Sequence, residues 1–139
     1  MPTPNPAGLS EGMLALLGLR ISQLNGCGRE LYGHHQSAKQ AGETEERLVL
    51  IAAWRDAPFF TDAERAALDL AEWITLRASA PPRIWARAAR CHTPRELLAL
   101  LVTIVTVNLT QTVHSGPKHR ATRNPLGSNI FFQDFRNSP

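Results

Sequence analysis

The chain has 139 residues, a length that suits one compact domain rather than two. Hydrophobic residues make up 43% of it and charged residues 19%, ordinary proportions for a globular protein with a sizeable core. The formal net charge is +3, and the part from residue 116 onward holds four Lys and Arg residues against one Asp, which accounts for that charge. The remaining body is near neutral, which argues against a nucleic-acid partner, because such partners need many clustered cations.

Cysteine content and hydropathy indicate the compartment. The two cysteines, Cys27 and Cys91, are too few for a disulfide framework. The N-terminus lacks a charged segment followed by an apolar one, so we expect no secretory signal. The most apolar run, residues 97–107, is about half the length that spans a bilayer. The sequence therefore predicts a cytoplasmic protein with reduced thiols and no membrane partner.

The first part of the chain predicts a lead-in and two helices. Residues 1–9 carry proline at alternate positions, which is typical of a flexible lead-in. Ser10 can cap a helix whose apolar positions form roughly one stripe, and Asn25-Gly26 ends it. A second helix is predicted over residues 27–41, and Gly42 then lies where a left-handed helix end is expected.

Four more helices are predicted before residue 115. Thr44 caps a helix that extends through Trp54, and Thr61 with Glu64 forms the capping box of the next. A short helix is predicted over residues 84–89, and the cap at 93–96 begins a last, long helix. No convincing strand alternation is present. We therefore predict an all-α fold of about six helices, with residues 10–115 as one domain.

The last helix and the residues after it carry two further predictions. The helix is apolar on most sides through Val107, which favours a buried position or a place at a subunit interface. Residues 116–139 are predicted to form an irregular basic tail. Its apolar cluster, residues 130–135, either docks on the body or a neighbouring subunit or stays disordered with the rest.

A candidate site lies around Cys27, at the predicted start of the second helix. The positive end of the helix dipole favours thiolate over thiol there. His34 follows after seven residues, nearly two turns, so it lies on the same stripe as Cys27. Glu30 lies between them within reach of either, and its charge opposes the dipole unless Arg29 offsets it. The sequence thus predicts a polar cluster of thiol, carboxylate and imidazole.

Two other interpretations of these residues stay open. A cysteine at a helix start is often a small buried apolar residue, and a helical histidine is often a hydrogen-bonded surface group. Alternatively, Cys27, Glu30 and His34, with His35 adjacent, offer three ligand types to one metal ion. Ligands from a single helix rarely complete a tetrahedral site by themselves.

Other conspicuous side chains favour structural interpretations. Three tryptophans are expected to anchor the core or an interface rather than to stack on a ligand: Trp54, Trp73 and Trp85. His114 and His119 are expected to be solvated, and Cys91-His92 is expected to be a pair in a loop.

Three stretches of the chain resemble the alkyl hydroperoxidase D-like and carboxymuconolactone decarboxylase-like family. Residues 20–27, RISQLNGC, resemble the family's RxSQxNGC stretch. Residues 41–48, AGETEERL, and 52–61, AAWRDAPFFT, resemble AGETEQRL and AAWRETPFF. The likeness is contiguous over about residues 14–77 and weakens afterwards, with Asn108 in the place of a recurrent asparagine.

The resemblance implies a helical fold, assembly into trimers or hexamers, and thiol chemistry without a cofactor. In active members one cysteine of a Cys-x-x-Cys-x-x-x-His motif attacks a peroxide and its partner resolves the sulfenic acid to a disulfide, which a thiol reductant then reduces. A glutamate and the histidine relay protons. Here Cys27 matches the first cysteine and His34 the histidine.

The chain departs from the family pattern at two relay positions. Glu30 stands where the second, peroxide-attacking cysteine is usual, and Ala15 stands where the relay glutamate is usual. Residues 109–112 also replace the usual xWNR continuation, which predicts a last helix that ends early or packs differently. Any catalytic cycle then needs another resolving thiol, from Cys91, a neighbouring subunit or a small molecule.

The predicted function is a thiol-dependent, peroxidase-like oxidoreductase of the antioxidant, alkyl hydroperoxide class, with Cys27 as nucleophile, His34 as base and Glu30 in the site. It needs no metal, and its expected partners are other copies of itself and a thiol reductant. The alternatives are a catalytically inactive oligomeric scaffold or binding protein, the metal site above, and a lactone-type decarboxylase, for which no residue specifically argues.

Overall fold

The structure is a computed structural model that describes residues 8–115. Within that range the chain forms α-helices and one short 3₁₀ helix and no strand, which confirms the predicted all-α fold of about six helices. The elements in chain order are α1 (Glu11–Asn25), α2 (Gly28–Gln40), α3 (Glu45–Leu50), η1 (Ile51–Ala53), α4 (Asp62–Arg77), α5 (Pro82–Cys91) and α6 (Pro94–Ser115). The predicted tail, residues 116–139, lies outside the described residues, as do positions 1–7 of the lead-in.

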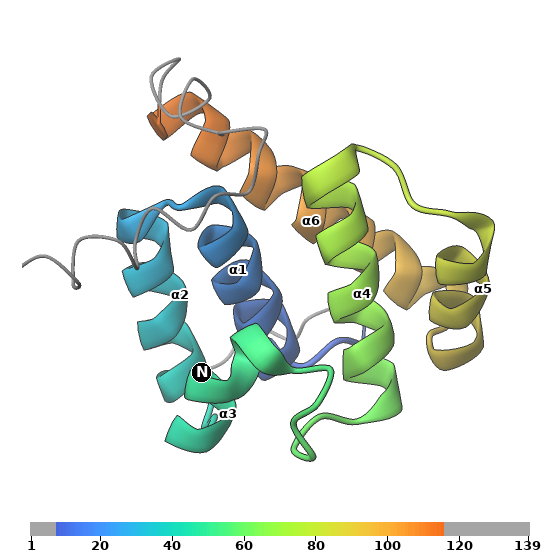
Figure 1. Ribbon diagram of the computed structural model, residues 1–139, viewed down its shortest axis with the longest axis horizontal. Helices are drawn as coiled ribbons and strands as arrows, with labels where there is room; N and C mark the ends of the chain where they lie inside the picture. The colour runs from blue at the N-terminus through green and yellow to red at the C-terminus, as the bar shows by residue number, and fades with distance from the viewer. Residues whose placement is uncertain (1–7, 116–139) are drawn as a thin grey trace, which may run out of the picture.

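Helix α1 is the centre of the bundle, and α2, α4 and α6 pack around it (Figure 1). Ser10 caps it as predicted, since its Oγ accepts a hydrogen bond from Met13 N at 3.0 Å. Most of its residues are buried, and Leu16, Leu17 and Ile21 are fully buried. Gly26 ends the helix with φ 67°, the left-handed conformation that glycine adopts without strain.

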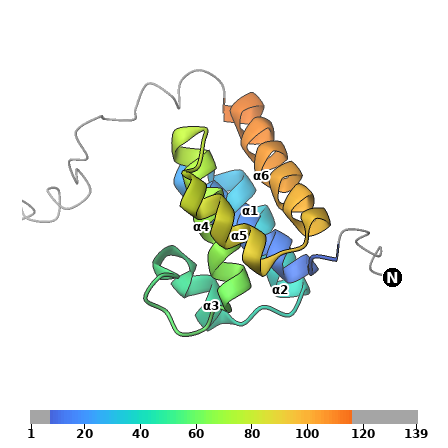
Figure 2. The same ribbon diagram turned by 90° about the vertical axis from the view of Figure 1, so that its right-hand side faces the viewer.

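Helix α4 lies beside α1 and carries the predicted capping box. Thr61 N donates to the Glu64 carboxylate at 2.8 Å, and Glu64 N donates to Thr61 Oγ1 at 3.2 Å. Small buried side chains on this helix, Ala66, Ala67 and Ala71, contribute to the packed core between helices. Helix α5 packs on the other side of α4, away from α1 (Figure 2).

The boundaries of two predicted helices were wrong. The helix after Thr44 leaves the α-conformation at Leu50 and tightens into η1, so Trp54 lies beyond both elements. Helix α5 begins earlier than predicted, at Pro82, because a proline in the first turn has no intrahelical donor to lose. It also ends later than predicted, at Cys91.

Helix α6 is buried on one side only, which contradicts the predicted buried position and leaves the alternative, a place at a subunit interface, as a prediction. Only one side of it, at Leu100, Ile104 and Gln111, faces the bundle and is fully enclosed. The opposite side exposes five large apolar side chains: Leu98, Val102, Val105, Leu109 and Val113. The helix also does not end early, since it continues through the altered residues 109–112 to Ser115. Residues 94–114 are long and apolar enough to cross a membrane by length and composition alone.

Candidate functional site

Cys27 occupies the N-cap position of α2, as the sequence predicted. Its backbone N donates to Ser22 O at 3.1 Å, and its carbonyl accepts from Leu31 N at 2.9 Å. Its side chain makes no capping bond, and the thiol is free and half-buried. The sulfur therefore lies at the positive end of a 13-residue helix with partial access to solvent.

His34 lies against the backbone of α1, at Gly18. A methyl group added to Gly18 would come within 2.3 Å of His34 Nδ1, so the ring occupies the space that a side chain there would need. This contact half-buries the imidazole, and burial lowers the pKa of His34 from 6.5, while the nearby Glu30 carboxylate opposes that shift. His34 is therefore mainly neutral, and able to accept a proton, at neutral pH.

Glu30 stands between two histidines. The charge of the Glu30 carboxylate raises the pKa of His34, which also lies on α2. The Glu30 Oε1 atom lies 3.9 Å from Nδ1 of His114 on α6. His114 was predicted to be solvated, and its side chain is indeed 47% exposed, but it also joins this cluster. Nothing local in the sequence indicates the pair, because α6 returns to α2 only in the folded bundle.

The Cys27 thiol and the His34 ring make no direct hydrogen bond within residues 8–115. Their seven-residue separation on α2 leaves them two turns apart on one side of the helix. Catalytic hydrogen bonds are often long before substrate binds. Two turns amount to about 10 Å along the helix axis, so a proton path between the two groups requires more than one bridging molecule.

The metal interpretation finds no support in the arrangement of side chains. Across the described range, no three His, Cys, Asp or Glu residues are placed to hold one ion, and this includes Cys27, Glu30, His34 and His35. His92, whose pairing with Cys91 in a loop was predicted, is instead the buried C-cap of α5. Its Nε2 lies 2.9 Å from Ala63 O and thereby links α5 to α4.

A polar cluster fixes the turn that presents Cys27. Asn25 Nδ2 donates to Asn108 Oδ1 at 3.0 Å and to Gln111 Oε1 at 2.8 Å, both on α6. Gln111 Nε2 donates in turn to the buried Ser22 Oγ at 2.7 Å. Asn108 also donates to Thr75 Oγ1 of α4 at 3.0 Å. The end of α1 is therefore attached to two other helices one turn before the thiol.

A second polar cluster surrounds Glu72, which is 6% exposed. Its carboxylate accepts from Arg20 Nε at 2.7 Å, Trp54 Nε1 at 2.9 Å and Arg55 Nη1 at 2.6 Å. Burial alone would raise the pKa of Glu72, but these donors outweigh it and hold the pKa below its usual range. The sequence analysis did not identify Glu72, although all three of its partners lie in the motif stretches quoted above.

Comparison with known proteins places the chain in a family. The sequence pattern of the carboxymuconolactone decarboxylase family matches residues 4–73, half of the chain. The chain belongs to the carboxymuconolactone decarboxylase family. The resemblance seen in the sequence is thereby confirmed, and the matched region contains Cys27, Glu30 and His34.

Two known proteins show how far the likeness extends. This chain is 34% identical over 95 residues to the uncharacterised protein YdfG of Bacillus subtilis, and the alignment covers 67% of this chain and 65% of YdfG. The crystal structure of ATU0492 from Agrobacterium tumefaciens superposes with a TM-score of 0.74 at 27% identity, over 78% of this chain and 76% of that one. ATU0492 is a protein of unknown function that is provisionally assigned as an antioxidant defence protein, AhpD.

Proposed function

We propose that this protein is an antioxidant, thiol-dependent peroxidase-like oxidoreductase that uses Cys27 as its single attacking sulfur. The observation that carries the proposal is the half-buried His34, whose lowered pKa keeps it a neutral base on the same helix as an N-cap thiol. The likeness to a protein provisionally assigned to antioxidant defence supports the same class.

In the proposed reaction, His34 accepts the thiol proton and the Cys27 thiolate attacks one oxygen of a hydroperoxide. The O–O bond breaks, Cys27 becomes a sulfenic acid, and the leaving alkoxide takes the proton from His34 to form an alcohol. The sulfur is oxidised by two electrons and the peroxide is reduced by two. Glu30 stabilises the imidazolium that exists between the two proton transfers.

The cycle closes with an external thiol, because Glu30 replaces the usual second motif cysteine. One donor thiol displaces water from the sulfenic acid to give a mixed disulfide, and a second donor thiol releases the Cys27 thiol and a donor disulfide. Such a cycle needs a reducing compartment, so we place the protein in the cytoplasm. It requires no cofactor, since the sulfur carries both electrons.

Peroxide consumption by single-cysteine variants tests this proposal. With dithiothreitol as donor, we expect turnover of hydrogen peroxide or cumene hydroperoxide by the wild type and by Cys91→Ser, and none by Cys27→Ser. Loss of turnover in Cys91→Ser would reject the single-sulfur cycle. A wild type without turnover would favour the second candidate, an inactive scaffold, which the changes at Ala15 and Glu30 support.

We also propose that the protein is a homo-oligomer, a trimer or hexamer, assembled through the exposed side of α6. The five exposed residues recur at intervals of four, three, four and four, so they form one continuous apolar stripe opposite the buried side. Such a stripe on a soluble domain indicates an interface. A second copy of α6 would cover it along its whole length.

Light scattering on purified variants tests the assembly. Val105→Glu places a charge in the middle of the stripe, and we expect a shift toward monomer. Val49→Glu is the matched control, because Val49 is 73% exposed on α3 and lies away from α6. Equal masses for the wild type and Val105→Glu, or binding of the wild type to phospholipid vesicles through this stripe, would contradict the assembly.

A further inference from the structure

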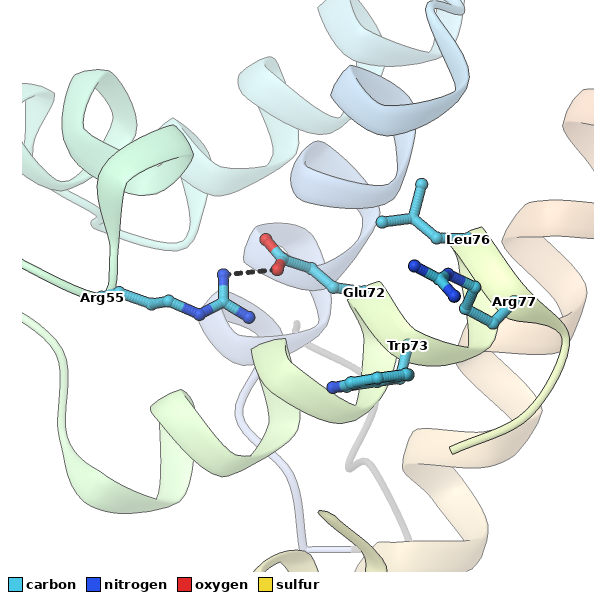
Figure 3. Close-up of a pocket in the computed structure, with 5 residues that line it drawn as sticks. All are labelled: Arg55, Glu72, Trp73, Leu76 and Arg77. Carbon is cyan, nitrogen blue, oxygen red and sulfur yellow. Dashed lines mark hydrogen bonds and ion pairs between the residues drawn. The ribbon is translucent and has the colours of Figure 1, made fainter. Parts of the chain in front are cut away.

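A small cavity lies at the C-terminal part of α4, in front of the Glu72 cluster (Figure 3). It is lined by Arg55, Glu72, Trp73, Leu76 and Arg77 and has a volume of about 160 Å³. Figure 3 shows Arg77 folded back along α4 near the Trp73 ring, while Arg55 extends toward Glu72 from the opposite side. The cavity therefore has cations on two sides and an apolar wall on the third.

The cavity carries more positive than negative charge. Glu72 already receives three donors and Asp69 is paired with Arg55 and Arg87, so neither carboxylate neutralises Arg77. Neither Arg77 nor Arg83 forms an ion pair with any carboxylate in the described part of the chain. Arg83 comes from α5, which contains no acidic residue.

Both unpaired guanidiniums lie near a single indole ring. The distance to the Trp73 ring centroid is 5.7 Å from Arg77 and 5.6 Å from Arg83. These contacts hold Arg77 in the wall of the cavity and Arg83 beside the Trp73 ring, and they leave the N–H groups of both free for an anion. Leu76, which is 47% exposed, extends the apolar wall beside the ring.

We propose that this cavity binds a small organic carboxylate with an aromatic or branched apolar body. Arg77, assisted by Arg83, would pair with the carboxylate, and Trp73 with Leu76 would pack on the body. The volume is below that of pockets for drug-sized ligands, which limits the ligand to about the size of a single ring. The hydrogen bonds of the Glu72 cluster hold Arg55 in place against α4.

The probe for this site is sodium benzoate, followed through the indole N–H signal of Trp73 in ¹⁵N-labelled full-length protein. The Trp73→Phe variant assigns the signal, and sodium chloride keeps the ionic strength constant. We expect a saturable shift of the Trp73 signal at millimolar benzoate, with the signal of Trp85, which does not line the cavity, as an internal control that does not move. Arg77→Gln is expected to weaken binding at least about fivefold, the effect of losing one charge-assisted pair.

Matched ligands and variants separate this site from general salt binding. Arg90→Gln removes an exposed cation of α5 that does not line the cavity, and we expect unchanged binding. Benzyl alcohol, which lacks the charge, and acetate, which lacks the ring, are expected to give no saturable shift. A linear shift with benzoate, an equal response to either analogue, or full binding by Arg77→Gln would overturn the proposal.

Discussion

The carboxylates of Glu72 and Glu30 have different surroundings, although both are at least partly buried. Glu72 is enclosed and accepts from three donors on two different segments, α1 and the residues that follow η1, so its charge is fully balanced. Within residues 8–115, Glu30 interacts with the imidazoles of His34 and His114, and its ion-pair contact with the half-exposed His114 is 3.9 Å long. Glu72 is therefore a structural anchor, whereas the charge of Glu30 remains available to a neighbouring proton acceptor.

This difference shows how one small helical bundle can contain both a rigid structural anchor and a site that responds to a reacting group. A carboxylate whose oxygens are all engaged holds helices together but cannot respond to a reacting group. A carboxylate with few fixed partners contributes little to stability, yet it can stabilise an imidazolium as that charge forms. Substitutions at the two sites should separate loss of stability from loss of reactivity.

The largest effect is expected from Glu72→Ala. The change leaves Arg20, Arg55 and the Trp54 indole without their shared acceptor, and we expect a loss of about 3 kcal/mol of unfolding free energy. Urea denaturation followed by circular dichroism measures it. The control is Glu46→Gln, an exposed residue of α3, which should change stability by less than about 0.5 kcal/mol. A loss below about 1 kcal/mol for Glu72→Ala would show that the cluster is not an anchor.

An intermediate effect is expected from Gly18→Ala, which acts on the reactive site rather than on the anchor. The new methyl group displaces the His34 ring toward solvent, so the pKa of His34 should rise toward 6.5 and peroxide turnover should fall about tenfold or more. Ring-proton titration by NMR and steady-state rates measure the two effects.

Gly33→Ala is the matched control, because Gly33 directly precedes His34 on α2 and an added methyl group there meets nothing within 4 Å. This substitution should stabilise the helix by about 0.5–1 kcal/mol and leave the His34 titration unchanged. If both alanine variants behave alike, the contact between His34 and α1 has no role in reactivity.

The smallest effect is expected from Glu30→Gln on the pH profile. Neutral His34 is the base, so activity falls as the pH drops through the pKa of His34, which lies below 6.5. Glu30 raises that pKa, and its removal should lower it further and move the acid limb of kcat/KM to lower pH. If the acid limb moves to higher pH, or does not move, the Glu30 carboxylate does not raise the pKa of His34 in the active protein.

The sequence was sufficient to predict features that depend on neighbours in the chain. Ser10 and the pair Thr61 and Glu64 cap their helices as expected, because each cap is complete within four residues. The N-cap position of Cys27 likewise follows from the Asn25-Gly26 break. These local rules located the candidate thiol and the overall helix order.

Features that depend on distant pairs were not predictable in the same way. Arg20 and Glu72 are 52 positions apart, and nothing in either local pattern joins them. His114 meets Glu30 only because α6 crosses the end of the bundle. The sequence of α6 left a buried position and a subunit interface as alternatives because the helix is apolar on both sides, and periodicity alone does not distinguish residues that contact the core from residues that a partner covers.

Trapping the oxidised sulfur tests the account's central claim most directly. After one equivalent of hydrogen peroxide, dimedone labelling and peptide mass spectrometry report which cysteine has become a sulfenic acid. The account predicts label on Cys27 in the wild type, much less of it in Gly18→Ala, and little on Cys91. Label mainly on Cys91, or none on Cys27 at any pH between 6 and 8, would contradict it.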